Sequence, residues 1–130
     1  MSELEPQFEG ELPADAVVIR GGRMKAEDLK DAGEAYWARF EGKRGYALTV
    51  WCWPGHTAEQ TAEAVGATRL PHPVIRKCAA GKLQELGYPL EPSFGEHHYS
   101  LRLPDPPTPQ DWINLHRAFD PPQPNPVGRR

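Results

Sequence analysis

Apolar positions recur with a period of two in some segments and of three to four in others, and these periods predict the strands and helices. A β-branched run, 16–20, is closed by two glycines and predicts a buried strand. Residues 46–53 predict a strand with two largely apolar faces, so we expect it in the middle of a sheet with a cover on each side. Segments 89–94 and 97–103 flank a two-residue turn at 95–96 and predict a hairpin.

Helices are predicted where apolar residues recur every three or four positions. Two of them begin with a clear N-terminal signal: Thr57 with Gln60 three residues on, and Thr108 followed by Pro109. The segment before the third helix, 74–78, favours a strand. The predicted helices cover 24–40, 58–65, 79–86 and a last segment from Pro109 to about Phe119.

This order of elements predicts an α+β single domain, with a mixed sheet of four or five strands, three or four helices and extended termini. The globular domain is expected over 16–119. The N-terminal arm, 1–15, holds five carboxylates and no lysine or arginine, and it is too polar to repay the entropy of ordering. The C-terminal tail, 120–130, carries four prolines and is expected to run as an extended strap or a loose tail.

Composition narrows the class of protein without assigning an activity. No apolar run approaches the length of a membrane span, and no charged segment followed by an apolar one opens the chain, so neither membrane nor export is expected. Two cysteines cannot form a disulfide framework, which favours a cytoplasmic protein with reduced thiols. Cys52 lies between two tryptophans and is expected to be buried and inert. Scarce Asn, Ile and Lys beside abundant Ala, Arg and Pro favour a bacterial source.

Charge is distributed unevenly along the chain. The formal net charge is −3, but without the acidic arm fifteen basic residues face thirteen acidic ones, a net charge of +2. Basic residues cluster near 20–25, 39–44 and 69–82, each time mixed with acids, which is typical of a solvated surface. RNA binding through 69–82 is disfavoured by the near-neutral charge and the absence of an RNP-like motif.

Familiar catalytic and metal-binding patterns do not occur in the sequence. It has no CxxC, HxxxH or HExxH spacing, so no metal site is expected, and no G-x-S-x-G around a serine. Gly21 and Gly22 stand between a strand and a helix, where a helix N-terminus can hold an anion. The segment GGRM lacks the dinucleotide and P-loop patterns, however, which favours a tight turn over a phosphate site.

Polar residues near strand ends form the one arrangement that could be an active site. An arginine beside two glycines can meet an anion with its guanidinium fork while backbone N–H groups add donors. A hydroxyl on the central strand can line the same cleft, and a carboxylate or imidazole at the hairpin can hold a ribose hydroxyl. The candidate ligand-binding cleft comprises Arg20, Gly21, Gly22, Thr49, Glu96 and His98.

The segment 17–51 resembles the opening layout of small ADP-ribosyltransferase-fold toxins, in its Val-Ile-Arg-Gly-Gly strand end and in Gly-Tyr-Ala-Leu-Thr-Val after a helix. The resemblance implies that Arg20 contacts the diphosphate or nicotinamide ribose of NAD and that Thr49 forms the cleft wall. It maps Glu96 to the catalytic acid. Thr49 stands at the family's serine position, and no E-x-E follows it in the sequence.

Two functions from different classes follow. The favoured hypothesis is a non-catalytic protein-interaction module without a cofactor, binding another protein or itself. It is based on four tryptophans that cannot all be buried in a domain of this size, and on the proline-rich tail. The alternative is a toxin-like NAD-dependent ADP-ribosyltransferase-fold enzyme held by a partner protein. No catalytic residue is assigned under the favoured hypothesis.

Overall fold

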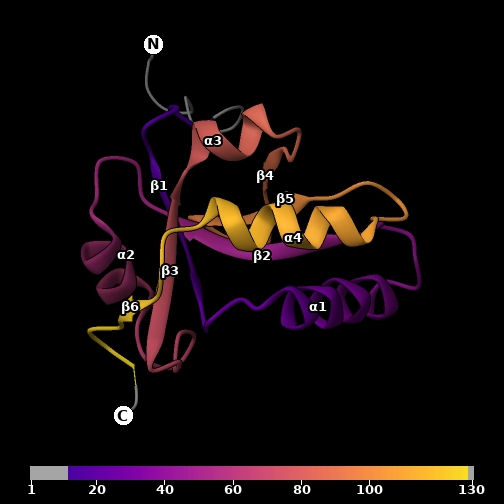
Figure 1. The fold of residues 1–130 in the computed structure, drawn as a ribbon. Helices are drawn as coiled ribbons and strands as arrows, with labels where there is room; N and C mark the ends of the chain where they lie inside the picture. Colours follow the sequence, from indigo (N-terminus) through magenta and orange to yellow (C-terminus); the bar gives the residue numbers. More distant parts are fainter. Residues whose placement is uncertain (1–11, 129–130) are drawn as a thin grey trace.

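A six-stranded sheet forms the centre of the protein (Figure 1). The computed structural model describes residues 12–128, and this range holds six strands and four helices. They are β1 (Val17–Gly21), α1 (Ala26–Arg39), β2 (Ala47–Cys52), α2 (Ala58–Val65), β3 (Val74–Ala79), α3 (Ala80–Glu85), β4 (Leu90–Pro92), β5 (His98–Arg102), α4 (Pro109–Ala118) and β6 (Gln123–Pro124).

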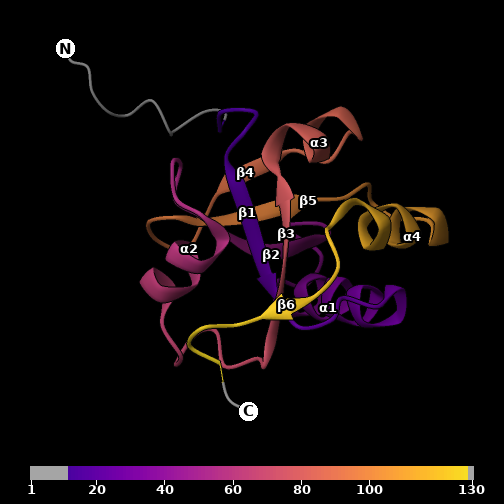
Figure 2. The same cartoon turned by 60° about the vertical axis from the view of Figure 1, so that its left-hand side comes forward.

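The strands lie in the order β4-β5-β2-β1-β3-β6, and every neighbouring pair is antiparallel. Helices α1, α3 and α4 lie on one side of the sheet and α2 on the other (Figure 2). Each side has its own apolar cluster. The larger one joins Val18, Val50 and Leu101 to residues of α1, α3 and α4, whereas the smaller one joins Ile19 and Ile75 to α2. As expected, β2 is central and covered on both faces.

The α+β class and the four helices are confirmed, but the sheet differs from the prediction in two respects. It has six strands rather than four or five, and it is antiparallel throughout rather than mixed. A mixed sheet needs at least one parallel pair of strands, but β2 returns beside β1 in the opposite direction, with Val18 opposite Cys52. The additional strand, β6, has two residues, too few to show a hydrophobic period. Its Pro124 is tolerated because the strand lies at the edge of the sheet.

Both predicted helix starts are confirmed as complete capping boxes. The backbone N–H of Gln60 donates to the Thr57 hydroxyl over 3.1 Å, and that of Thr57 donates to the Gln60 side chain over 2.9 Å. At α4, Asp111 plays the same part for Thr108, and it also accepts a 2.7 Å hydrogen bond from the Tyr88 hydroxyl. Local sequence therefore sets where these helices begin.

The predicted hairpin is present, but its connection is longer than two residues. Five residues, 93–97, join β4 to β5, and three of them lie in the left-handed region, Phe94, Gly95 and His97. β4 ends at Pro92, which has no N–H with which to extend the ladder. The alternation predicted for the second strand holds, because Tyr99 and Leu101 join the larger core.

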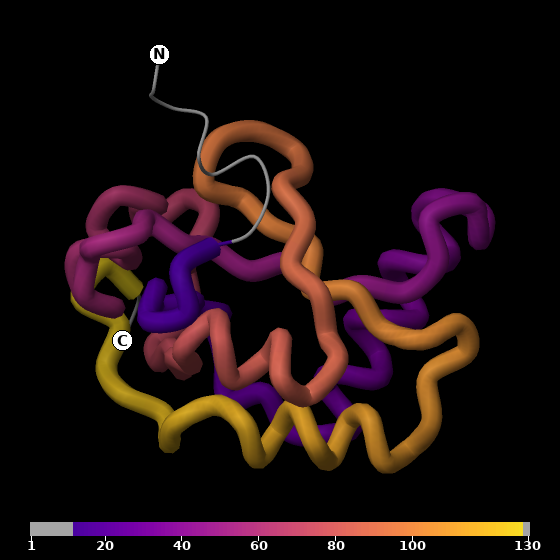
Figure 3. The backbone as a smooth tube through the Cα atoms, turned by 90° about the horizontal axis from the view of Figure 1, so that it is seen from above, coloured from indigo at the N-terminus to yellow at the C-terminus, as the bar shows by residue number. Residues whose placement is uncertain are grey.

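Packing extends beyond the predicted globular limits of 16–119 at both ends. Leu12 belongs to the larger core, and the rest of the predicted acidic arm, 1–11, lies outside the described residues. At the other end the chain follows the outside of the molecule as an extended strap (Figure 3). Asn125 is buried in this strap, and its amide donates to the carbonyls of Leu70 and His72 over 2.9 and 2.8 Å.

Arg76, in the middle of β3, joins the elements packed on one face of the sheet. The residue is 4 % exposed, and its guanidinium donates mainly to backbone carbonyls, with Nη1 also 3.2 Å from Nδ1 of His116. Nε donates to Asp120, Nη1 to Arg23, and Nη2 to His116 and Phe119, over 2.6–3.0 Å. Carbonyls at the end of a helix have no partner within it, so this guanidinium caps α4 and fixes the β1–α1 loop against it.

We expect Arg76→Met to lower the free energy of unfolding by about 3–5 kcal/mol, because four backbone carbonyls, each buried or partly buried at this contact, lose their donor. Urea denaturation followed by tryptophan fluorescence measures the change. Lys77→Gln, at the next position of the same strand, serves as the control and should stay within about 0.5 kcal/mol of the natural protein. An unchanged midpoint for the Arg76 variant would contradict this role.

Candidate functional site

β1 pairs with β3 over more residues than with β2, and this leaves an opening in the sheet. It pairs with β3 at five positions but with β2 at only two, Val18 with Cys52 and Ile19 with Trp51. Beyond Ile19 the strands β1 and β2 separate. We call the opening between Arg20–Gly21 and Thr49 the notch.

The side chain of Arg20 crosses this notch. The N–H of Cys52 donates to His97 on the β5 side, so by the alternation of an antiparallel ladder the backbone of Thr49 points toward β1. β1 has already turned away there. Nη1 of Arg20 takes the place of the missing strand: it donates to the Thr49 carbonyl over 2.7 Å and lies 3.4 Å from its hydroxyl. Burial lowers the pKa of Arg20 to about 10, so the side chain stays charged at neutral pH.

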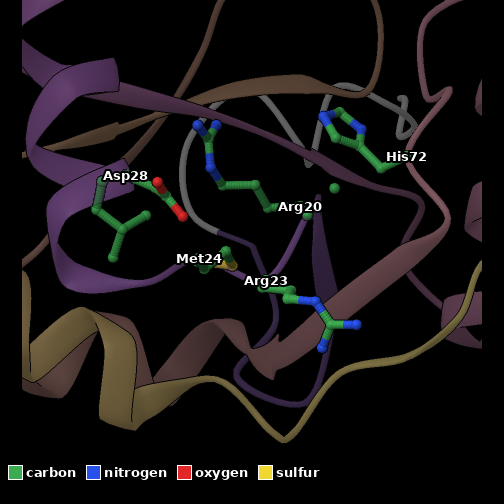
Figure 4. Close-up of a pocket in the computed structure, with 8 residues that line it drawn as sticks. Arg20, Arg23, Met24, Asp28 and His72 are labelled. Carbon is green, nitrogen blue, oxygen red and sulfur yellow. The ribbon is translucent and has the colours of Figure 1, made fainter.

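Two cavities meet at Arg20, and Figure 4 shows residues that line the one beside α1. Both are lined by Arg20, Gly21 and His72. The first, of about 230 Å³, borders α1 and is also lined by Gly22, Arg23, Met24, Asp28 and Leu29. The second, of about 170 Å³, borders the connection from α2 to β3 and is also lined by Thr49, Trp51, Arg69 and Leu70. We call the second one the basic cavity.

The two glycines permit this arrangement by different means. A Cβ on Gly21 would lie 2.1 Å from Nδ1 of His72, so the imidazole packs directly on the strand backbone and no larger residue fits. Gly22 has φ +92, the left-handed conformation that makes the tight turn expected from the sequence. The His72 carbonyl is in turn held by Asn125, which fixes this wall of the cavity.

The basic cavity has two arginines and no acidic residue among its lining residues. The guanidinium of Arg69 lies over the Trp51 ring, 5.6 Å from its centroid. Burial, and to a lesser extent the charge of Arg20, lowers the pKa of His72, so its imidazole is neutral at pH 7. The cavity therefore presents two positive charges beside an aromatic ring and a hydroxyl, a chemistry that suits an anion.

Four of the six predicted cleft residues come together at the notch, Arg20, Gly21, Gly22 and Thr49. The other two do not line either cavity. His98 is buried behind the basic cavity, edge-on to Trp51 with ring centroids 4.6 Å apart. Its Nδ1 lies 3.0 Å from the Ser93 carbonyl, and burial lowers its pKa.

Glu96 is exposed in the loop between β4 and β5. That loop lies at the end of β2 farther from the notch, because the ring of His97 stacks on Trp53 with centroids 4.0 Å apart. The structure thus joins Arg20 to Thr49, but it does not bring the carboxylate of Glu96 to them.

Sequence reasoning missed the side chains that complete the site, Arg69, His72 and Asp28. One signal was available for His72, because the prolines on either side of it predict a rigid loop that fixes its position. Arg69 and Asp28 carry no periodicity or motif that separates them from other surface charges.

Reactive thiols and metal clusters do not contribute to the site. Burial raises the pKa of Cys52 to about 12 and that of Cys78 to about 11, so both thiols stay protonated and inert. Among residues 12–128, no three His, Cys, Asp or Glu side chains converge as metal ligands would. Nor does any helix in this range have the length and apolar character to cross a membrane.

No protein-family model, curated protein or solved structure matches the chain. The site is therefore interpreted from its own geometry.

We expect the stability of the fold to fall as the pH drops below about 6.5. Burial lowers the pKa values of His72 and His98 in the folded protein, so the unfolded chain binds more protons between the folded pKa values and 6.5. The free energy of unfolding then decreases with decreasing pH across this range. Urea denaturation at about pH 7.5 and about pH 5.5 tests the direction, and NMR titration of the two imidazoles assigns it. The prediction would be contradicted by imidazole signals that titrate above pH 6.5, together with a free energy of unfolding that does not change with pH.

Proposed function

We propose that the protein is a non-catalytic interaction module that binds an acidic side chain of a partner protein in its basic cavity. The observation that carries this proposal is the charge of the cavity: Arg20 and Arg69 line it, and no carboxylate does. A carboxylate fits the planar fork of a guanidinium, and a charge-assisted hydrogen bond is stronger than a neutral one.

Arg20 is held in place before any ligand binds. Its hydrogen bond to the Thr49 carbonyl fixes the guanidinium, so little side-chain entropy is lost on binding. Arg69 is exposed, and its guanidinium rests on the Trp51 ring. A fixed cation beside an adaptable one is a suitable pair for a side chain delivered by another protein.

The size of the cavity also favours this assignment. Sites for drug-sized ligands and cofactors usually enclose about 300–1,000 Å³. The basic cavity has about 170 Å³, enough for a carboxylate and the start of its side chain. The remainder of such a ligand would lie outside the cavity, as a protein chain does.

Exposed aromatic side chains add support for a protein partner. Trp37 and Phe94 are 39 % and 44 % exposed. Phe94 stacks on Phe40, and the guanidinium of Arg44 lies 4.8 Å from the centroid of the Phe40 ring. Aromatic residues and arginine dominate the energetically important positions of protein interfaces. A bacterial source and a cytoplasmic location belong to the same proposal, on the composition and the two unpaired cysteines.

One observation favours the alternative, a toxin-like NAD-dependent enzyme of the ADP-ribosyltransferase fold. Arg20 and Thr49, which that resemblance assigns to one NAD cleft, are hydrogen-bonded across the notch. The geometry supports it less well, because Glu96 lies elsewhere and the cavities are small.

Calorimetric titration with NAD separates the two functions. We expect no saturable heat at roughly millimolar NAD, an affinity that would correspond to only about 4 kcal/mol of binding free energy. Saturable heat that disappears in Arg20→Ala, with the fold of the variant verified by circular dichroism, would instead support the NAD enzyme.

For the favoured function, we expect Arg69→Gln to weaken binding of a fluorescein-labelled oligoglutamate peptide about five- to tenfold, equivalent to about 1–1.4 kcal/mol. Arg69 is chosen because Arg20 also closes the notch. Fluorescence anisotropy measures binding, which should decrease as salt is added. Arg39→Gln, which removes an exposed arginine elsewhere, is the matched control and should have little effect. Equal binding of oligoglutamate and oligoglutamine would refute the proposal.

A further inference from the structure

Beyond the basic cavity, a second positively charged hollow lies near the end of α4. It has a volume of about 540 Å³, and no acidic residue lines it. Its walls are Arg23, Lys25, Arg76, His116, Arg117, Phe119, Pro121 and Pro122.

The three hollows adjoin one another through the residues that they share, and the middle one is also lined by one acidic residue, Asp28. The basic cavity and the cavity beside α1 have Arg20, Gly21 and His72 in common, and the cavity beside α1 shares Arg23 with the hollow at α4. We call this series, from Arg69 to Arg117, the basic groove.

We infer that the basic groove binds an extended acidic segment of the partner, with several carboxylates spaced along it. This inference rests on the proposed function and specifies its ligand, since a single acidic side chain needs only the basic cavity.

The charge at the far end of the groove exceeds what the fold requires. A cation near the C-terminus of a helix offsets the helix dipole, so the fold explains one positive charge at the end of α4. Arg76 already supplies it, because its donors are bonded to the last carbonyls of α4. Arg23 and Lys25 belong to the β1–α1 loop rather than to the helix. Neither they nor Arg117 form an ion pair with a carboxylate of residues 12–128.

Arg20 in β1 and Arg23 in the β1–α1 loop both line the cavity beside α1, but only Arg20 also lines the basic cavity and only Arg23 also lines the hollow at α4. The side chains of Arg20 and Arg23 point in different directions from the backbone, as Figure 4 shows. The loop is fixed between them: Gly22 and Met24 both lie in the left-handed region, and Met24 is buried. Nδ1 of His116 lies 2.9 Å from the Met24 carbonyl, so the tautomer protonated at Nδ1 donates to it. Two separated positions for anions are therefore built into a rigid turn.

The chemistry of the walls favours a peptide over a nucleic acid. Phe119, Pro121 and Pro122 give the hollow at α4 an apolar side, which can take the methylene groups of glutamate side chains.

The test compares two peptides and three variants in the full-length protein. The peptides are oligoglutamate and an oligoglutamine of equal length with one glutamate, and the variants are Arg69→Gln, Arg117→Gln and the control Arg39→Gln. Anisotropy follows the first peptide, and the indole N–H signal of Trp51 in NMR spectra follows the second. All three arginines are exposed, so the variants should fold, which thermal denaturation verifies.

We expect Arg117→Gln to weaken oligoglutamate binding about five- to tenfold and to leave the single-glutamate peptide unaffected, whereas Arg69→Gln weakens both. An effect of Arg69→Gln alone would overturn the extended groove and leave the proposed function standing. If neither variant loses binding, the extended groove and the proposed function are both overturned. Tighter binding of oligothymidylate than of oligoglutamate at equal salt would overturn the assignment to an acidic peptide.

Discussion

A buried guanidinium whose bonding partners are backbone carbonyls holds this fold together on one face of its sheet. Arg76 satisfies the last carbonyls of α4 and the carbonyl of Arg23 at once, so the end of a helix, the β1–α1 loop and the start of the C-terminal strap share one donor group. A positive charge in such a place is costly unless every donor is used. That cost makes the three segments a single unit, and it fixes the loop that carries Arg23 and follows Arg20.

A second arginine performs the opposite task at the notch. β1 follows β3 rather than β2, which leaves the Thr49 carbonyl without a strand beside it. Arg20 supplies the missing donor and keeps part of its guanidinium for the cavities on either side. The donors of Arg76 are thus occupied within the fold, whereas Arg20 and the exposed Arg69 line the basic cavity. Arginine thus stabilises the fold at one position and lines a cavity at another. The difference is the number of backbone carbonyls within reach of each guanidinium.

What the sequence predicts well depends on local interactions. The capping boxes at Thr57 and Thr108 need only a few neighbouring residues, and the central position of β2 follows from its two apolar faces. The direction of β2 relative to β1 and the pairing of β6 depend on distant segments and were not predicted. The same holds at the site: Arg20 and Thr49 were grouped correctly because strand ends are visible in the sequence. Arg69, His72 and Arg117 come from loops and a helix end, where charged residues show no periodicity. Glu96 lies away from the notch because the five-residue connection between β4 and β5 packs beside Trp53.

The amide of Asn125 has a consequence for how the two ends of the site communicate. It bonds to the carbonyls of Leu70 and His72, both of which belong to the wall of the basic cavity, while its own segment continues the strap that Arg76 anchors. Displacement of the last strand would therefore remove two hydrogen bonds from the loop that forms this wall.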